Sequence, residues 1–536
     1  MRLAIEVNMG SVGVFVVALL LGLYATYELL PGLPAGKVKI IYRARPIPFP
    51  RSPLALVVVG LGSEMIYLLY FVGQFPLLQY YTTSTTMQAI ANGSPGGFAI
   101  FLALSTLLFL LCAVACWQGC RTTDRAIFWI ALGFGALFGI TMAFVYPITA
   151  NDAFAYVNQS RVLVLHHDNP IFMPAASYPN DPFVGLAGQW AASGSPYGPL
   201  GILVDALPTV VTGNNFLANL IVLKLMFVGI TLICAVLVYH VLKRMGHKFA
   251  LLGLVLVAWN PLLLIEIAAN GHNDAAMMLL VMLGLLLCGR NKLLLGLVAV
   301  VASALVKYAT APLIPLFLIY GVAHQPTLRR RVAFVALSVV CSFVFAAALY
   351  LPFWHGPDTF TRSLQEDQFH IESFDSVVGP LFAHWLTFDQ ATLLGRGLFA
   401  VAYLVALWLS TRRLADLALG CFLSLFFFVA LGAGNVKIWY AVWPAVLAAV
   451  TPQLFARVPA LLLAWGATLS AAFYAYIWPW IGADGFMTAN YASYAISFVP
   501  AVLVLLVLLL LRVRRRFRVA NRRIAPTYST PTPETG

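Results

Sequence analysis

Long apolar runs recur from one end of the chain to the other, and polar residues collect between them. A window of about 20 apolar residues is long enough to cross a bilayer as an α-helix. Backbone polar groups must be paired in lipid, and the runs lack the alternation of barrel strands, so we expect helices. The pattern predicts an all-α polytopic membrane protein with about 13–15 transmembrane helices, drawn from residues 12–31, 54–73, 99–118, 126–148, 215–242, 250–267, 275–289, 293–306, 309–321, 332–351, 392–409, 414–433, 438–451, 458–480 and 494–511.

The composition agrees with this prediction. Of the 536 residues, 61% are hydrophobic and 10% are charged, whereas about 25% of the residues of a soluble domain are charged. The sequence contains no Walker A, dinucleotide-binding or HExxH pattern, so it gives no support for nucleotide or zinc chemistry. Glu64 and Lys224 each fall inside an apolar run, where two opposite charges can pair with each other.

The basic residues are concentrated in every second loop. These loops and the C-terminal tail hold 25 of the 32 Lys and Arg residues. The positive-inside rule therefore predicts an N-terminus outside and a C-terminus in the cytoplasm. We expect residues 1–511 to form a single transmembrane domain and residues 512–536 to form a basic, disordered tail. Such a tail contacts anionic lipid more readily than nucleic acid.

Two long loops, 149–214 and 352–391, fall on the predicted outer side. Loops of this length in a compact protein usually carry function. Shorter outer turns are polar as well, for example the stretch EIAANGHND at 266–274. A charge deep in a bilayer is costly, so we expect such residues to face a cavity or the interface. The sequence thus predicts a ring of polar side chains at the outer membrane boundary, made by Asp152, His272, Asp274, Lys307 and Lys437.

A carboxylate beside basic residues at the depth of lipid headgroups suits the transfer of a sugar from a lipid phosphate. The carboxylate takes the proton of an acceptor hydroxyl while the anomeric carbon becomes oxocarbenium-like. Cationic groups stabilise the phosphate as its charge develops. The alternative is a lipid or sugar transporter or flippase, and the interrupted segment 293–321 keeps this alternative open.

Six segments carry a resemblance to a known family. They are NDAFAY at 151–156, HHDNPIF at 166–172, SPYGPL at 195–200, HNDAAMMLLVMLGLLL at 272–287, ALVKYATAPLIPL at 304–316 and KIWYAVWPAVLA at 437–448. In order and spacing they resemble the GT-C superfamily of polyprenyl-phosphate-sugar glycosyltransferases. Within it, they are most similar to the actinobacterial polyprenol-phosphate-mannose-dependent α-1,6-mannosyltransferases of the cell envelope. The resemblance covers about residues 150–450 and implies a GT-C-like helical bundle.

The resemblance also implies roles for residues of this chain. Asp152 corresponds to the acidic base, and Lys307 corresponds to a basic residue near the lipid phosphate. The neighbour of Asp152 is Asn151, where part of the superfamily has a second acid, so the resemblance implies a single base. The remaining residues expected to bind donor or substrate are Tyr197, His272, Asn273, Asp274, Lys437, Trp439, Tyr440 and Arg161.

The implied reaction moves a sugar, with mannose as the first choice, from a polyprenyl-phosphate donor to a glycolipid or glycan acceptor on the extracytoplasmic face. A β-linked donor attacked in line gives an α-linked product with inversion. No cofactor is assigned. A divalent cation is conceivable, but His166, His167 and Asp168 do not form a clear set of ligands.

Each candidate also has a plainer interpretation. Asp152 follows an asparagine and can simply occupy a helix start. His272 and Asp274 can cap the next helix. Lys307 can extend to the interface with no ligand, and Arg161 can anchor the edge of a span.

Overall fold

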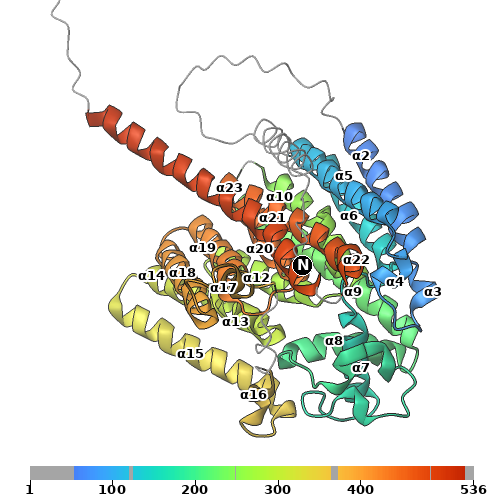
Figure 1. Ribbon diagram of the computed structural model, residues 1–536. Coiled ribbons are helices and arrows are strands. Elements are labelled where there is room, and N and C mark those ends of the chain that lie inside the picture. Colours follow the sequence, from blue (N-terminus) through green and yellow to red (C-terminus); the bar gives the residue numbers. More distant parts are fainter. Residues whose placement is uncertain (1–52, 120–124, 248, 364–371, 483–484, 525–536) are drawn as a thin grey trace, which may run out of the picture.

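Figure 1 shows a computed structural model of the chain, which describes residues 53–119, 125–247, 249–363, 372–482 and 485–524. These residues form helices and contain no strand, apart from an isolated bridge between Pro76 and Val145. In this part of the chain, ten helices are long and apolar enough to cross a membrane: α2 with η1 (Pro53–Val72), α5 (Pro95–Gly119), α6 (Arg125–Ala143), α9 (Phe216–Arg244), α10 through η4 (Ala250–Ala269), α15 with η6 (Leu328–Phe353), α18 (Phe388–Leu409), α19 with η8 (Leu414–Gly432), α21 with η10 (Phe455–Ile477) and part of α23 (Thr488–Leu511).

The prediction of an all-α polytopic membrane protein is confirmed, and the remaining predicted spans are shorter helices. The run at 12–31 lies outside the described residues. The other four form helices of 10–17 residues, shorter than the roughly 20 residues that cross a bilayer. These are α12 (Asp274–Gly289), α13 (Leu293–Val306), η5 with α14 (Tyr308–Ala323) and η9 with α20 (Ile438–Val450).

The helices sort by how much of their surface the protein covers. Every residue in the most apolar part of the span Ala250–Ala269 is buried, whereas only 11% of the residues in the corresponding parts of α15 and α18 are. A helix that is apolar all round must lie in a protein core or face lipid. The exposed faces of α15 and α18 therefore face lipid in a bilayer, and α10 forms the centre of the bundle, in contact with α5, α6, α9 and α20.

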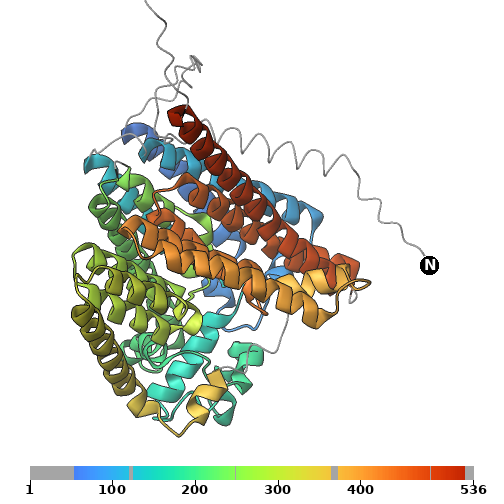
Figure 2. The same cartoon turned by 90° about the vertical axis from the view of Figure 1, so that its left-hand side faces the viewer.

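The first long loop and the start of the second lie together at one end of the bundle. Helices α7 (Asp152–Val164) and α8 (Pro199–Thr212) from the first loop and α16 (Asp358–Ser363) from the second occupy the lower end of the molecule in Figure 1. Asn169 Nδ2 donates a hydrogen bond to the Phe353 carbonyl oxygen at 2.9 Å. Ile171, Ile202 and Phe353 pack into one apolar cluster. Figure 2, turned by 90°, shows the same grouping.

Two glycines bring α8 against the end of α13. A Cβ atom at Gly198 would lie 2.1 Å from the Leu305 carbonyl oxygen, and one at Gly201 would lie 2.5 Å from that of Val306. Only a residue without a side chain permits such an approach. The stretch SPYGPL therefore packs its helix start directly on the residues before Lys307, and this contact brings Tyr197 beside Lys307.

Glu64 and Lys224 do not pair with each other as the sequence suggested. Lys224 Nζ instead donates to the carbonyl oxygens of Ala143 at 3.2 Å and Val145 at 2.5 Å. These carbonyls lie at the end of α6, where helical partners run out. Glu64 accepts a hydrogen bond from Thr141 Oγ1 at 2.5 Å. Each of the two groups thus bonds to a nearby polar group rather than to the other charge.

The basic C-terminal segment differs in part from the expected disordered tail. Helix α23 (Gly485–Ile524) continues through the arginines that follow Leu511. Arginine is a good helix former, and a helix already nucleated in an apolar span extends at little cost. Residues 525–536 lie outside the described part of the chain.

Candidate active site

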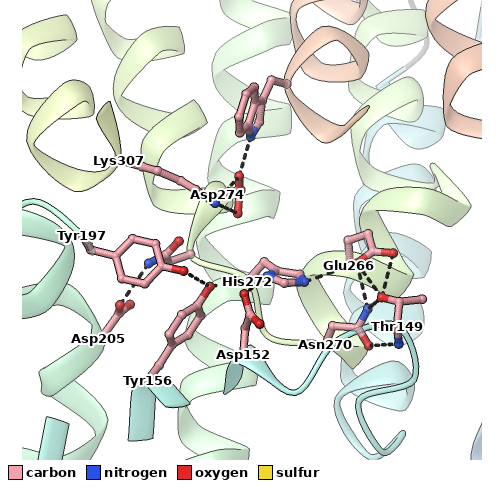
Figure 3. Close-up of polar contacts among 12 residues, drawn as sticks. Thr149, Asp152, Tyr156, Tyr197, Asp205, Glu266, Asn270, His272, Asp274 and Lys307 are labelled. Carbon is pink, nitrogen blue, oxygen red and sulfur yellow. Dashed lines mark hydrogen bonds and ion pairs between the residues drawn. The ribbon is translucent and has the colours of Figure 1, made fainter. Parts of the chain in front are cut away.

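Asp152 stands in the first turn of α7, with its side chain turned toward His272 (Figure 3). The residue is 7% exposed, and its Oδ2 atom lies 3.8 Å from His272 Nδ1. Burial raises the pKa of the Asp152 carboxyl, and the nearby His272, Lys307 and Lys437 act in the opposite direction. A buried carboxyl among cations is a proton acceptor with a tuned affinity.

His272 lies between Asp152 and a second carboxylate, Glu266. Its Nε2 atom is 3.4 Å from Glu266 Oε2. One face of the imidazole stacks on Trp439, with 4.4 Å between ring centroids and 22° between planes. Gly271, at φ +76°, closes the turn that leads into this histidine, and its position faces the Ala153 side chain. The turn thereby holds His272 against the start of α7.

Lys307 forms an ion pair with Asp274, two residues after His272. Lys307 Nζ lies 3.0 Å from Asp274 Oδ2 and 3.2 Å from Oδ1. The indole of Trp443 donates a further hydrogen bond to Oδ1 of this carboxylate. The ammonium group also faces the rings of Tyr197, Tyr440 and Trp443 at 5.4–5.8 Å. Aromatic faces stabilise a cation that has left water.

A fourth carboxyl, Asp205 of α8, lies near this pair. Its Oδ2 atom accepts a hydrogen bond from Asn273 Nδ2 at 3.0 Å, and burial raises the pKa of Asp205 to about 8. Tyr156 lies between His272 and Tyr197, because its hydroxyl is 3.1 Å from that of Tyr197 and 3.5 Å from His272 Nδ1.

An open cleft runs along one side of Asp152. It encloses about 420 Å³, including its open mouth, and Lys437, Trp439, Tyr440 and Trp190 contribute to its walls. The acid comes from the first long loop, whereas the lysine and two of the aromatic rings come from the turn before α20. A cleft with one acid, one cation and several aromatic faces suits a sugar bound next to an anion.

Most residues singled out from the sequence meet in this site, and one does not. Asp152, Tyr197, His272, Asn273, Asp274, Lys307, Lys437, Trp439 and Tyr440 contact one another or line the cleft.

Arg161, by contrast, pairs with Asp181 at 2.8 Å and donates to Asn214 Oδ1 at 2.6 Å. Its guanidinium also lies 5.0 Å from the centre of the Phe183 ring. These contacts fasten α7 to the rest of its own loop, because a guanidinium satisfies several partners at once.

Sequence reasoning gave no role to Tyr156, Asp205, Glu266 and Trp443. Glu266 counted only as a member of the polar turn at 266–274. The available signal was the presence of a carboxylate inside an apolar stretch, which is rare without a partner.

Within the described residues, no group of three or more His, Cys, Asp or Glu side chains is arranged to hold a metal ion.

Comparison with known proteins finds relatives of one kind. Residues 57–323 match the model of the alpha-(1->6)-mannopyranosyltransferase family, N-terminal domain. The chain is 25% identical over 386 residues to alpha-(1->6)-mannopyranosyltransferase A of Mycobacterium tuberculosis, an alignment that covers 65% of this chain and 72% of that protein.

Two further relatives match shorter parts. Alpha-(1->6)-mannopyranosyltransferase A of Corynebacterium glutamicum is 24% identical over 205 residues, or 36% of this chain, and the chain spans only 41% of the length of that relative. A probable alpha-(1->6)-mannopyranosyltransferase of Mycolicibacterium smegmatis is 27% identical over 165 residues, which is 30% of this chain and 28% of that protein. These matches confirm the resemblance to actinobacterial α-1,6-mannosyltransferases that the sequence motifs predicted.

Proposed function

We propose that this chain, as a relative of the α-(1→6)-mannopyranosyltransferases, transfers mannose from a polyprenyl-phosphate donor to a glycolipid or glycan acceptor. The reaction takes place on the extracytoplasmic face, with inversion, and Asp152 is the general base. The observation that carries the proposal is the position of Asp152, a buried carboxyl in the wall of a cleft whose other walls supply a lysine and aromatic rings.

In the proposed step, the acceptor hydroxyl oxygen bonds to the anomeric carbon of mannose. Its proton passes to the Asp152 carboxylate, and the bond from the anomeric carbon to the phosphate oxygen breaks. Polyprenyl phosphate leaves with the electron pair. Attack from the side opposite the phosphate converts a β-linked donor into an α-linked product. General base catalysis of this kind contributes about 10²–10⁴-fold in rate.

The two lysines of the site have different proposed roles toward the donor phosphate. Lys437 lines the cleft directly and is the proposed first contact of the donor phosphate. Lys307 is paired with Asp274, so we expect it to attract the donor phosphate less strongly than Lys437 does. Its proposed role is to stabilise the charge that develops on the leaving phosphate. Trp439, Tyr440 and Trp190 offer ring faces against which a sugar can stack, as in other sites with apolar walls and a few polar groups.

The test is a transfer assay with the purified full chain in sealed proteoliposomes. The protein is mixed with polyprenyl-phosphate [14C]mannose and a lipid extract that contains acceptors, and labelled glycolipid is separated by chromatography. Labelled product that disappears with Asp152→Asn supports the proposal. Movement of the labelled donor between leaflets without any product would support the flippase alternative and overturn the assignment as a transferase.

A further inference from the structure

Glu266 is a fully buried carboxylate to which the proposed reaction gives no task. It belongs to η4 (Leu264–Ala269), the end of a span that the protein covers on all sides, and its side chain is 0% exposed. A buried carboxylate is expensive unless several donors satisfy it. Its retention beside the cleft therefore calls for a role beyond packing.

The carboxylate is held by the segment that leads into Asp152. Thr149 Oγ1 donates to Glu266 Oε2 at 2.9 Å and lies 3.1 Å from Oε1. Asn270 Nδ2 donates to Oε2 at 2.8 Å, and the oxygen of the same amide accepts the backbone N–H of Ile148 at 2.8 Å. Figure 3 shows this group on the far side of His272 from Tyr156 and Tyr197.

His272 is the connection between Glu266 and the proposed base. Its two ring nitrogens point to different carboxylates, Nε2 toward Glu266 at 3.4 Å and Nδ1 toward Asp152 at 3.8 Å. Both nitrogens are donors when the ring is protonated. The stack on Trp439 fixes the plane of the ring, so the imidazole cannot turn away from either carboxylate without losing that contact.

We propose that Glu266 is a positioning residue that, through His272, keeps Asp152 ionised and ready to accept a proton. An imidazolium between two carboxylates is stabilised by both opposite charges. Glu266 therefore orients His272 and places a negative charge behind the ring, and His272 favours the carboxylate form of Asp152 against the cost of burial. This inference rests on the proposed function, because it requires Asp152 to act as the base.

The other charged groups around the pair do not replace this connection. The charges of Lys307 and Lys437 also lower the pKa of Asp152, and the charge of Asp274 raises it. Lys307 is committed to Asp274. His272 additionally faces the neutral hydroxyl of Tyr156 at 3.5 Å. Glu266 is thus the second carboxylate that faces His272 among the described contacts.

The test is the dependence of the transfer rate on pH for wild type and Glu266→Gln. The reaction needs ionised Asp152, so its rate falls as the pH drops through the pKa of that group. Without the Glu266 charge, the acid limb is expected to move to higher pH by about one unit, which is a tenfold loss of rate on the acid side. At alkaline pH, where Asp152 is ionised in both proteins, the rates are expected to converge.

Two further variants make the result specific. Glu266→Gln added to His272→Gln is expected to leave the acid limb where His272→Gln alone puts it, because the connection is already broken. The matched control is Glu64→Gln, a carboxyl in another span bonded to a threonine hydroxyl, which is expected to keep the wild-type profile. Melting temperatures in detergent accompany every profile.

The outcomes separate this inference from the proposed function. A rate loss for Glu266→Gln that is equal at every pH, or a shift that persists in the His272→Gln background, would overturn the positioning role. In either case, loss of transfer in Asp152→Asn would leave the proposed function standing. Full transfer by Asp152→Asn would instead overturn the base assignment, and with it the ground for this inference.

Discussion

Lys307 and Asp274 form an ion pair, with 3.0 Å between Nζ and Oδ2, and Asp274 is completely buried. The pair joins the C-terminal end of α13 to the first residue of α12. The ammonium and the carboxylate lose most of their hydration here, and each is the main compensation for the other.

This relationship predicts a non-additive effect on stability. Asp274→Asn or Lys307→Met alone leaves one charge buried without its partner and should cost about 3–5 kcal/mol. The double variant should be more stable than the sum of the two losses implies. Thermal unfolding in detergent, followed by size-exclusion chromatography, measures all four proteins. Strictly additive losses would show that the two charges are independent.

Removal of the proposed base should abolish transfer without loss of the fold. Asp152→Asn keeps the size of the side chain but cannot accept the proton, so we expect a decrease of about 10²–10⁴-fold in rate. The labelled transfer assay gives the rate, and the melting temperature reports the fold. Asp389→Asn, at an exposed acid in the first turn of α18, is the control and should retain the wild-type rate.

A single methyl group at Gly198 should disturb the site from a distance. Its Cβ atom would meet the Leu305 carbonyl oxygen at 2.1 Å, so Gly198→Ala must push α8 away from α13. We expect a loss of about 1–3 kcal/mol in stability, as in other overpacked contacts, together with reduced transfer because Tyr197 moves away from Lys307. Gly229→Ala in α9, where a Cβ atom meets nothing within 4 Å, should be harmless.

Asp205 predicts a dependence of stability on pH. Its pKa of about 8 in the folded chain is well above the usual value of about 3.9 in an unfolded chain. The folded state therefore holds a proton that the unfolded state releases, and stability should fall as pH rises from about 4 to about 8. Melting temperatures of wild type should decline over this range more steeply than those of Asp205→Asn. Parallel curves would contradict a protonated Asp205.

The apolar runs were sufficient to locate the helices, because the bilayer requires them to be long, apolar and internally hydrogen-bonded. The alternation of basic loops placed Asp152, His272, Asp274 and Lys307 at one predicted boundary, and the structure brings these four together. However, the alternation of basic loops predicts only the side of the membrane on which a residue lies. It gives no information on which helices are neighbours within the bundle.

That limit explains what sequence reasoning missed. Glu266 lies at the end of the central helix, and only the tertiary packing of η4 brings Thr149 to it, in addition to its near neighbours Asn270 and His272. Arg161 was expected to bind donor or substrate, but it pairs with Asp181 of the same loop. Asp181 lies in a turn whose position no periodic pattern predicts. Glu64 and Lys224 were plausible partners by charge, yet the carbonyls at the end of α6 and the Thr141 hydroxyl lie closer.

Two of the rings at the site come from outside the matched family segment. Trp439 stacks on His272 and Trp443 donates to Asp274, but both follow residue 323, where the match to the N-terminal family domain ends. The residues of the proposed site are therefore not confined to the matched segment. A chimera that exchanges only residues 57–323 between relatives combines the acids of one protein with Trp439 and Trp443 of the other. The segment that carries these two tryptophans therefore needs to be exchanged together with residues 57–323.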